Sequence, residues 1–194
     1  MRKSPSIEVL PGFYLLMAAG VLILPLRWLF AAIFAAVIHE LGHITAIYLC
    51  RGKIRTVRVS HSGAAIETAP MERGRGLLCT LAGPVCSLLL IFIFRWFPRL
   101  AVCAFAQGVY NLLPIWPLDG GVALRLLLPE PLQKAVSWGT LALVGIGCFY
   151  LTLWLDAGIL PLIFAFGLLA KKKTLQREAK SITIDLPINS EVRL

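Results

Sequence analysis

Residues 28–49 read WLFAAIFAAVIHELGHITAIYL, and this segment indicates the class of the protein. It is apolar over roughly the 20 residues that a helix needs to cross a membrane. The whole chain has the same character, because 58% of its 194 residues are apolar, only 15% are charged, and the mean hydropathy is +0.81. A water-soluble domain of this size cannot bury so much apolar surface. The composition excludes an ordinary soluble enzyme, a disordered chain and a nucleic-acid-binding domain, and it predicts an integral membrane protein.

Further apolar stretches accompany this segment, and together they predict an all-α polytopic protein with about six transmembrane helices. The predicted spans are 11–26, 28–49, 77–94, 100–118 and two helices within 136–170. The last stretch is too long for one crossing, so we expect a hairpin with its turn at 156–158.

The basic residues predict the orientation of these spans. All but three of the 19 Lys and Arg residues fall in segments that six crossings place on the same side as the N-terminus; the exceptions are Arg27, Arg95 and Arg99. Because Lys and Arg concentrate on the cytoplasmic side of membrane proteins, we expect both termini in the cytoplasm.

A segment between the second and third spans has a different pattern. Residues 54–68, IRTVRVSHSGAAIET, show partial alternation of apolar and polar side chains around a Ser-Gly turn. This pattern predicts a short membrane-associated β-hairpin. The alternative is a solvated basic loop.

Ionisable side chains interrupt the second span at His39-Glu40-Leu41-Gly42-His43. Such groups are costly inside lipid, so their presence indicates function. Residues four apart lie on one face of a helix, so His39 and His43 present their imidazoles to one point. This H-E-x-x-H pattern is typical of a zinc site. The alternatives are two hydrogen-bonded core histidines or a metal site without catalysis.

A catalytic zinc ion takes three protein ligands, so a third must come from elsewhere. His61 has suitable chemistry, but it lies at the predicted hairpin turn, where an exposed histidine is expected. Asp119 is the better candidate, in the stretch NLLPIWPLDGG at 111–121. Its two prolines must unwind the fourth span, and irregular backbone at membrane depth lines a cavity or is buried in protein. Alternatively, Asp119 caps a short helix at 120–128.

The two motifs at 39–43 and 111–121, with Ala82-Gly83-Pro84 between them, resemble the site-2 protease family of intramembrane zinc metalloproteases. Within this family, the predicted topology of six spans with a cytoplasmic N-terminus is similar to that of the bacterial subgroup that contains the sporulation stage IV protease. One position departs from the family pattern: Ser87 stands where members often carry Asn.

The resemblance implies one bound Zn²⁺ with His39, His43 and Asp119 as ligands. It also implies that Glu40 is the catalytic acid and base, and that Asn111 contacts the substrate or its developing oxyanion.

The implied function is regulated intramembrane proteolysis, in which a peptide bond within or near a transmembrane segment of a membrane-bound substrate is hydrolysed. We expect one transmembrane domain over residues 1–173, with its catalytic core at about 28–121, and a short cytoplasmic tail at 174–194. The implied location is a bacterial cell membrane or a forespore-type membrane. The resemblance is also compatible with regulatory partner proteins. A metal-ion transporter and an inactive metal-bound scaffold are the alternative functions.

Overall fold

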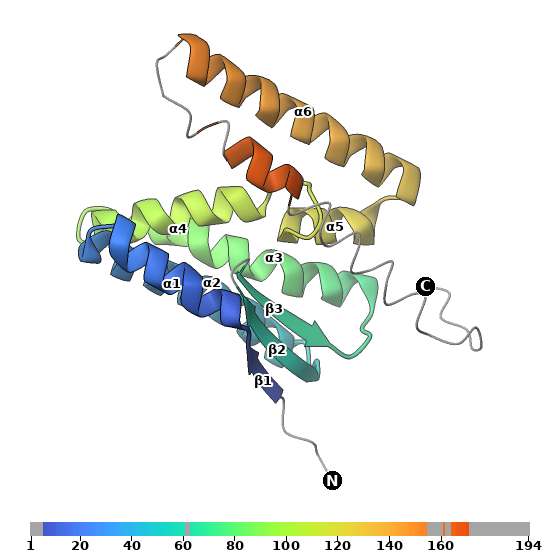
Figure 1. Ribbon diagram of the computed structural model, residues 1–194. Helices are drawn as coiled ribbons and strands as arrows, with labels where there is room; N and C mark the ends of the chain where they lie inside the picture. The colour runs from blue at the N-terminus through green and yellow to red at the C-terminus, as the bar shows by residue number, and fades with distance from the viewer. Residues whose placement is uncertain (1–5, 61–62, 155–160, 162–163, 171–194) are drawn as a thin grey trace. The chain divides into compact units, whose positions relative to one another are not determined.

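The computed structural model describes residues 6–60, 63–154, 161 and 164–170 (Figure 1). The chain divides into two compact units, Met1–Lys134 and Ala135–Leu194. In chain order the elements are β1 (Ser6–Val9), α1 (Pro11–Ile23), α2 (Leu26–Leu49), β2 (Ile54–Ser60), β3 (Gly63–Thr68), α3 (Arg73–Leu89), the 3₁₀ helix η1 (Leu90–Ile93), α4 (Pro98–Asn111), α5 (Asp119–Leu127) and α6 (Glu130–Trp154). Residues 164–170 are also helical.

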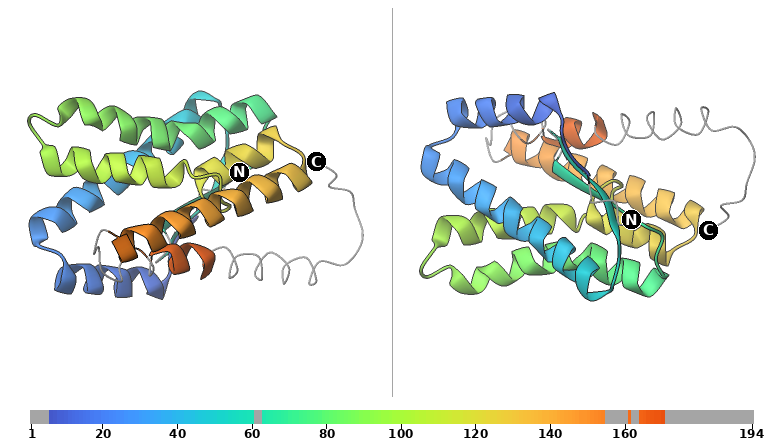
Figure 2. Two further views of the ribbon diagram at one scale, coloured as in Figure 1. Left: turned by 90° about the horizontal axis from the view of Figure 1, so that it is seen from above. Right: turned by 90° about the horizontal axis from the view of Figure 1, so that it is seen from below.

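Helix α2 organises the first unit, where it packs against α3 and α4 (Figure 2). Its buried side chains recur at four-residue intervals, so they form one stripe: Ala31, Ala35, His39, His43 and Ile47. The opposite face exposes large apolar side chains, among them Phe30, Phe34 and Leu41. A helix with apolar groups outside and ionisable groups inside is suited to lipid.

Three helices have the length and apolar composition needed to cross a membrane: Leu26–Leu49, Arg73–Ile93 and Glu130–Trp154. The helices α1 and α4, at the first and fourth predicted spans, have 13 and 14 residues. Both are shorter than the roughly 17 residues that a crossing helix needs. The turn predicted at 156–158 and the tail at 174–194 lie outside the described residues. Six transmembrane helices were predicted, and the described part of the chain contains three helices that are long enough to cross a membrane.

The hairpin predicted over residues 54–68 is confirmed, since β2 and β3 pair antiparallel with Val57 opposite Ile66. The strand β1 was not predicted. It lies parallel to β2, with Ile7 opposite Val57, and makes β2 the central strand of the sheet. The local sequence does not reveal β1, because its four residues are all exposed and show no alternation of buried and exposed side chains. Its partner strand also lies far away in the sequence.

Arg58 connects all three strands on one face of the sheet. Its Nε atom donates to Glu8 on β1 at 2.9 Å, and a second guanidinium nitrogen lies 3.2 Å from Glu67 on β3. The hydrogen bond to Glu8, followed by the charge of Glu67, raises the pKa of Arg58 above its ordinary value. The three side chains are about half exposed, so the ion pairs add little stability and act mainly to favour this strand register.

Helix α4 ends at Asn111 and residues 112–118 are not helical, which confirms the predicted unwinding of the fourth span at its two prolines. Pro114 and Pro117 explain the end of the helix, because proline lacks the backbone donor and disfavours helical backbone at the residue before it. The next helix, α5, begins at Asp119, close to the short helix predicted at 120–128. Its N-cap residue is Leu118, so Asp119 stands in the first turn and is not the cap.

Candidate metal centre

Two histidines on the buried stripe of α2 form one side of the site. The side chains of His39 and His43 are one helical turn apart, and their Nε2 atoms lie 3.3 Å from each other. The rings meet edge to face, with an interplanar angle of 80°. Both residues are largely buried, with relative exposures of 2% for His39 and 9% for His43. The helix therefore holds two imidazole nitrogens at one buried point.

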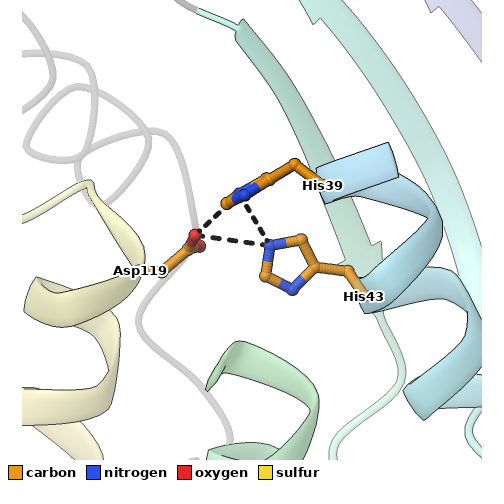
Figure 3. A group of neighbouring side chains, drawn as sticks. All are labelled: His39, His43 and Asp119. Carbon is orange, nitrogen blue, oxygen red and sulfur yellow. Dashed lines mark hydrogen bonds and ion pairs between the residues drawn. The ribbon is translucent and has the colours of Figure 1, made fainter. Parts of the chain in front are cut away.

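The carboxylate of Asp119 faces the same point from the start of α5 (Figure 3). Its Oδ2 atom lies 3.1 Å from Nε2 of His39 and 3.3 Å from Nε2 of His43. The structure thus brings together the three side chains that the sequence predicts as ligands, although Asp119 comes from a different helix. The other candidate, His61, lies outside the described residues.

The hydrogen bonds of the outer ring nitrogens show which atoms face the centre. Nδ1 of His43 lies 2.8 Å from the backbone carbonyl oxygen of Cys79. A carbonyl oxygen only accepts hydrogen bonds, so Nδ1 carries the hydrogen, and Nε2 of a neutral imidazole presents its lone pair. That lone pair faces the acceptor oxygen of Asp119. Two acceptors this close require a proton or a cation between them.

The separations fit a metal ion. The three ligand atoms lie 3.1, 3.3 and 3.3 Å from one another. Ligands placed about 2.0–2.1 Å from a tetrahedral zinc ion are about 3.3–3.4 Å apart. Two imidazoles and a carboxylate also match the ligand set of catalytic zinc sites. The residues present are therefore compatible with zinc in number, chemistry and spacing.

The loop at 112–118 and α5 pack tightly, and this packing sets where Asp119 lies. A Cβ atom at Gly121 would collide with the backbone of Ile115 and Trp116. The guanidinium of Arg125, one turn further along α5, lies 4.4 Å from the centre of the Trp116 ring. The close approach and the cation–π contact both join α5 to the loop that precedes it.

Two more predicted site residues lie beside the three ligand candidates. Asn111 is the last residue of α4, and its Nδ2 atom lies 3.3 Å from Nε2 of His39. Glu40 adjoins His39 in α2 and is partly buried. Its carboxylate is near enough to interact electrostatically with both histidines and with Asp119. All five predicted residues are thus at or next to one centre.

Helix α3 contributes two contacts that the sequence did not predict. The carbonyl of Cys79 accepts from His43, and the hydroxyl of Ser87 lies 2.9 Å from Nδ1 of His39. Between them, Gly83 is so close to His43 that a Cβ atom would collide with Nε2. The motif at 82–84 marks this helix in the sequence, but a backbone carbonyl leaves no sequence signal.

Comparisons with known proteins were made by sequence and by fold. No protein-family model matches the chain. Over 148 residues it is 29% identical to stage IV sporulation protein FB of Bacillus subtilis, a match that covers 67% of this chain and 51% of that protein. The chain thus spans about half the length of this curated relative.

The fold is similar to that of the site-2 protease from Methanocaldococcus jannaschii, with a TM-score of 0.58 and 17% identity. This match covers 100% of the chain and 98% of the solved one. At such low identity, it concerns the fold alone.

Proposed function

We propose that this chain is a member of the site-2 protease family and an intramembrane zinc metalloprotease, a proposal supported by its sequence similarity to the sporulation protein and by its fold. It would hydrolyse a peptide bond within or near a transmembrane segment of a membrane-bound substrate, as a step of regulated intramembrane proteolysis. One observation carries the proposal: Nε2 of His39, Nε2 of His43 and Oδ2 of Asp119 converge at 3.1–3.3 Å in a mostly buried site.

In this proposal His39, His43 and Asp119 hold one Zn²⁺ ion. The bound ion would supply Lewis acidity and lower the pKa of water at the centre. The two Nδ1 contacts, to Ser87 and Cys79, hold the rings so that both Nε2 atoms face inward.

Glu40 is the proposed acid and base. Its carboxylate would accept a proton from the water that attacks the peptide carbonyl, and it would then return a proton to the leaving amine. Its place next to His39, partly buried and within electrostatic range of all three ligand candidates, supports this role. Asn111, whose amide reaches His39, would donate a hydrogen bond to the oxygen that becomes negative during attack.

The substrate must expose a peptide bond before hydrolysis can occur. A transmembrane helix keeps its amides in internal hydrogen bonds, so the segment to be cut must first unwind. The sheet order leaves β3 as an edge strand, and an extended substrate segment would pair with such an edge. We further propose that both termini are cytoplasmic and that the host membrane is bacterial.

The test compares Glu40→Gln with the unsubstituted protein. Glu40→Gln should abolish cleavage while retaining zinc, because it removes the proton acceptor but none of the three ligands. Glu72→Gln is the matched control, since Glu72 is an exposed acid beside Arg75 and should leave cleavage unchanged. The measurements are the membrane-protein fragments found by proteomics in cells that carry each form, and the zinc content of each purified protein.

Three outcomes separate the proposal from its alternatives. Fragments that disappear only with Glu40→Gln support the protease. Retained fragments would remove Glu40 from the reaction. Metal uptake without any cleavage, independent of Glu40, would point to a transporter.

A further inference from the structure

We infer that Ser87 is a positioning residue for the metal site: its hydroxyl holds the ring of His39 through Nδ1, so that Nε2 faces the cation. This inference rests on the metal site of the proposed function. It concerns a side chain outside the proposed ligand set.

The contact is short and buried. Oγ of Ser87 lies 2.9 Å from Nδ1 of His39, and Ser87 is fully buried at 0% exposure. A buried hydroxyl without a partner is costly, particularly between apolar helices. The approach of α4 confines this side chain further, because a Cβ atom at Gly108 would lie 3.1 Å from Cβ of Ser87.

The contact with Ser87 serves the tautomer that metal binding requires. A neutral imidazole carries one hydrogen, on either Nδ1 or Nε2, and a protonated Nε2 cannot bind a metal. When Nδ1 carries the hydrogen, Oγ of Ser87 accepts it at 2.9 Å, and the lone pair of Nε2 faces Oδ2 of Asp119 and the amide nitrogen of Asn111. A hydroxyl can also donate to a bare Nδ1, so Ser87 fixes the orientation of the ring in both tautomers.

The two histidines depend on α3 in different ways. His43 is held by the backbone carbonyl of Cys79, which no side-chain substitution removes. His39 is held by the Ser87 side chain. Replacing Ser87 therefore tests the outer contact of a single ligand while the other stays in place.

The experiment uses the full-length protein in detergent with Ser87→Ala and Ser87→Cys. Alanine deletes the hydroxyl, and cysteine fills nearly the same volume with a poor hydrogen-bonding group. Zinc affinity is measured by competition with a chelator, and the ligand geometry by the visible absorption of the Co²⁺-substituted protein. Cys86→Ala truncates the neighbouring side chain of the same helix and serves as the matched control. Asp119→Ala removes a proposed ligand outright.

Loss of such an outer contact typically weakens metal binding about 10- to 100-fold. We expect this loss, with an altered Co²⁺ spectrum, in both Ser87 variants and not in Cys86→Ala. Zinc affinity within about twofold of the unsubstituted protein in both variants would overturn the inference. If Asp119→Ala also keeps its zinc, the metal site itself fails, and with it the proposed function. A purely structural role would lower thermal stability in the Ser87 variants while leaving the Co²⁺ spectrum unchanged, which also overturns the inference.

Discussion

Nε2 of His39 lies 3.1 Å from Oδ2 of Asp119, although 80 residues separate the two side chains in the sequence. One atom belongs to α2 and the other to the first turn of α5. A short loop that proline keeps from being helical brings them together. The site therefore depends as much on the backbone that precedes Asp119 as on the ligand candidates themselves.

Asp119→Ala should strongly reduce the zinc content of the purified protein. The substitution removes one of three proposed ligands and the negative charge that offsets the cation. The measurement is zinc per chain by mass spectrometry. Glu130→Ala is the control, because Glu130 forms an exposed ion pair with Lys134 and should leave zinc unchanged. Undiminished zinc in Asp119→Ala would remove this residue from the ligand set.

Gly83→Ala should lower both zinc affinity and stability. The new Cβ atom would collide with Nε2 of His43, so either the imidazole or α3 must shift. Overpacking of this kind costs about 1–3 kcal/mol. Thermal unfolding and chelator competition measure the two effects.

Gly74→Ala is the matched control for Gly83→Ala in the same helix. A Cβ atom at Gly74 would meet nothing within 4 Å. Alanine there should leave the fold intact, because Gly74 is the second residue of α3 and its Cβ atom would meet no neighbour. Equal zinc affinity in Gly83→Ala and Gly74→Ala would show that the close approach of α3 does not position His43.

Gly121→Ala should displace Asp119 without changing any ligand. Its Cβ atom would collide with the backbone of Ile115 and Trp116, so α5 and the loop before it could not keep their present distance. We expect weaker zinc binding by chelator competition. Gly139→Ala in α6, where a Cβ atom would meet nothing within 4 Å, should bind zinc normally. Normal binding by both variants would contradict the role of this contact.

Val57→Pro should impair substrate cleavage more than zinc retention. Val57 lies in the central strand and pairs with both Ile7 and Ile66, so proline would disturb the sheet that we propose presents an edge to the substrate. Ile7→Pro is the comparison, since it disturbs only the exposed strand β1. Fragment yield and zinc content are the two measurements. Unchanged cleavage in Val57→Pro would exclude the sheet from substrate handling.

Local patterns predicted those elements whose signal is continuous in the sequence. The helix expected at 28–49 is Leu26–Leu49, and the hairpin expected at 54–68 consists of β2 and β3. The strand β1 was missed because its parallel partner is distant in sequence. The unwinding at the end of the fourth span was predicted from Pro114 and Pro117, and the structure confirms it, since helix α4 ends at Asn111.

Two properties of the centre can be inferred without the structure. The spacing of His39 and His43 places both on one helical face, because 3.6 residues per turn is a property of the backbone. The apolar composition around them predicts a membrane location, since it exceeds what a soluble fold can bury.

The way in which these side chains are held depends on the packing of the helices. The hydroxyl of Ser87, the carbonyl of Cys79 and the carboxylate of Asp119 reach the histidines across helix interfaces. Such contacts depend on how closely helices approach, at glycines such as Gly83 and Gly121, and on where the backbone turns. Helical periodicity repeats locally along the chain, whereas these distances arise only when segments far apart in the sequence pack together.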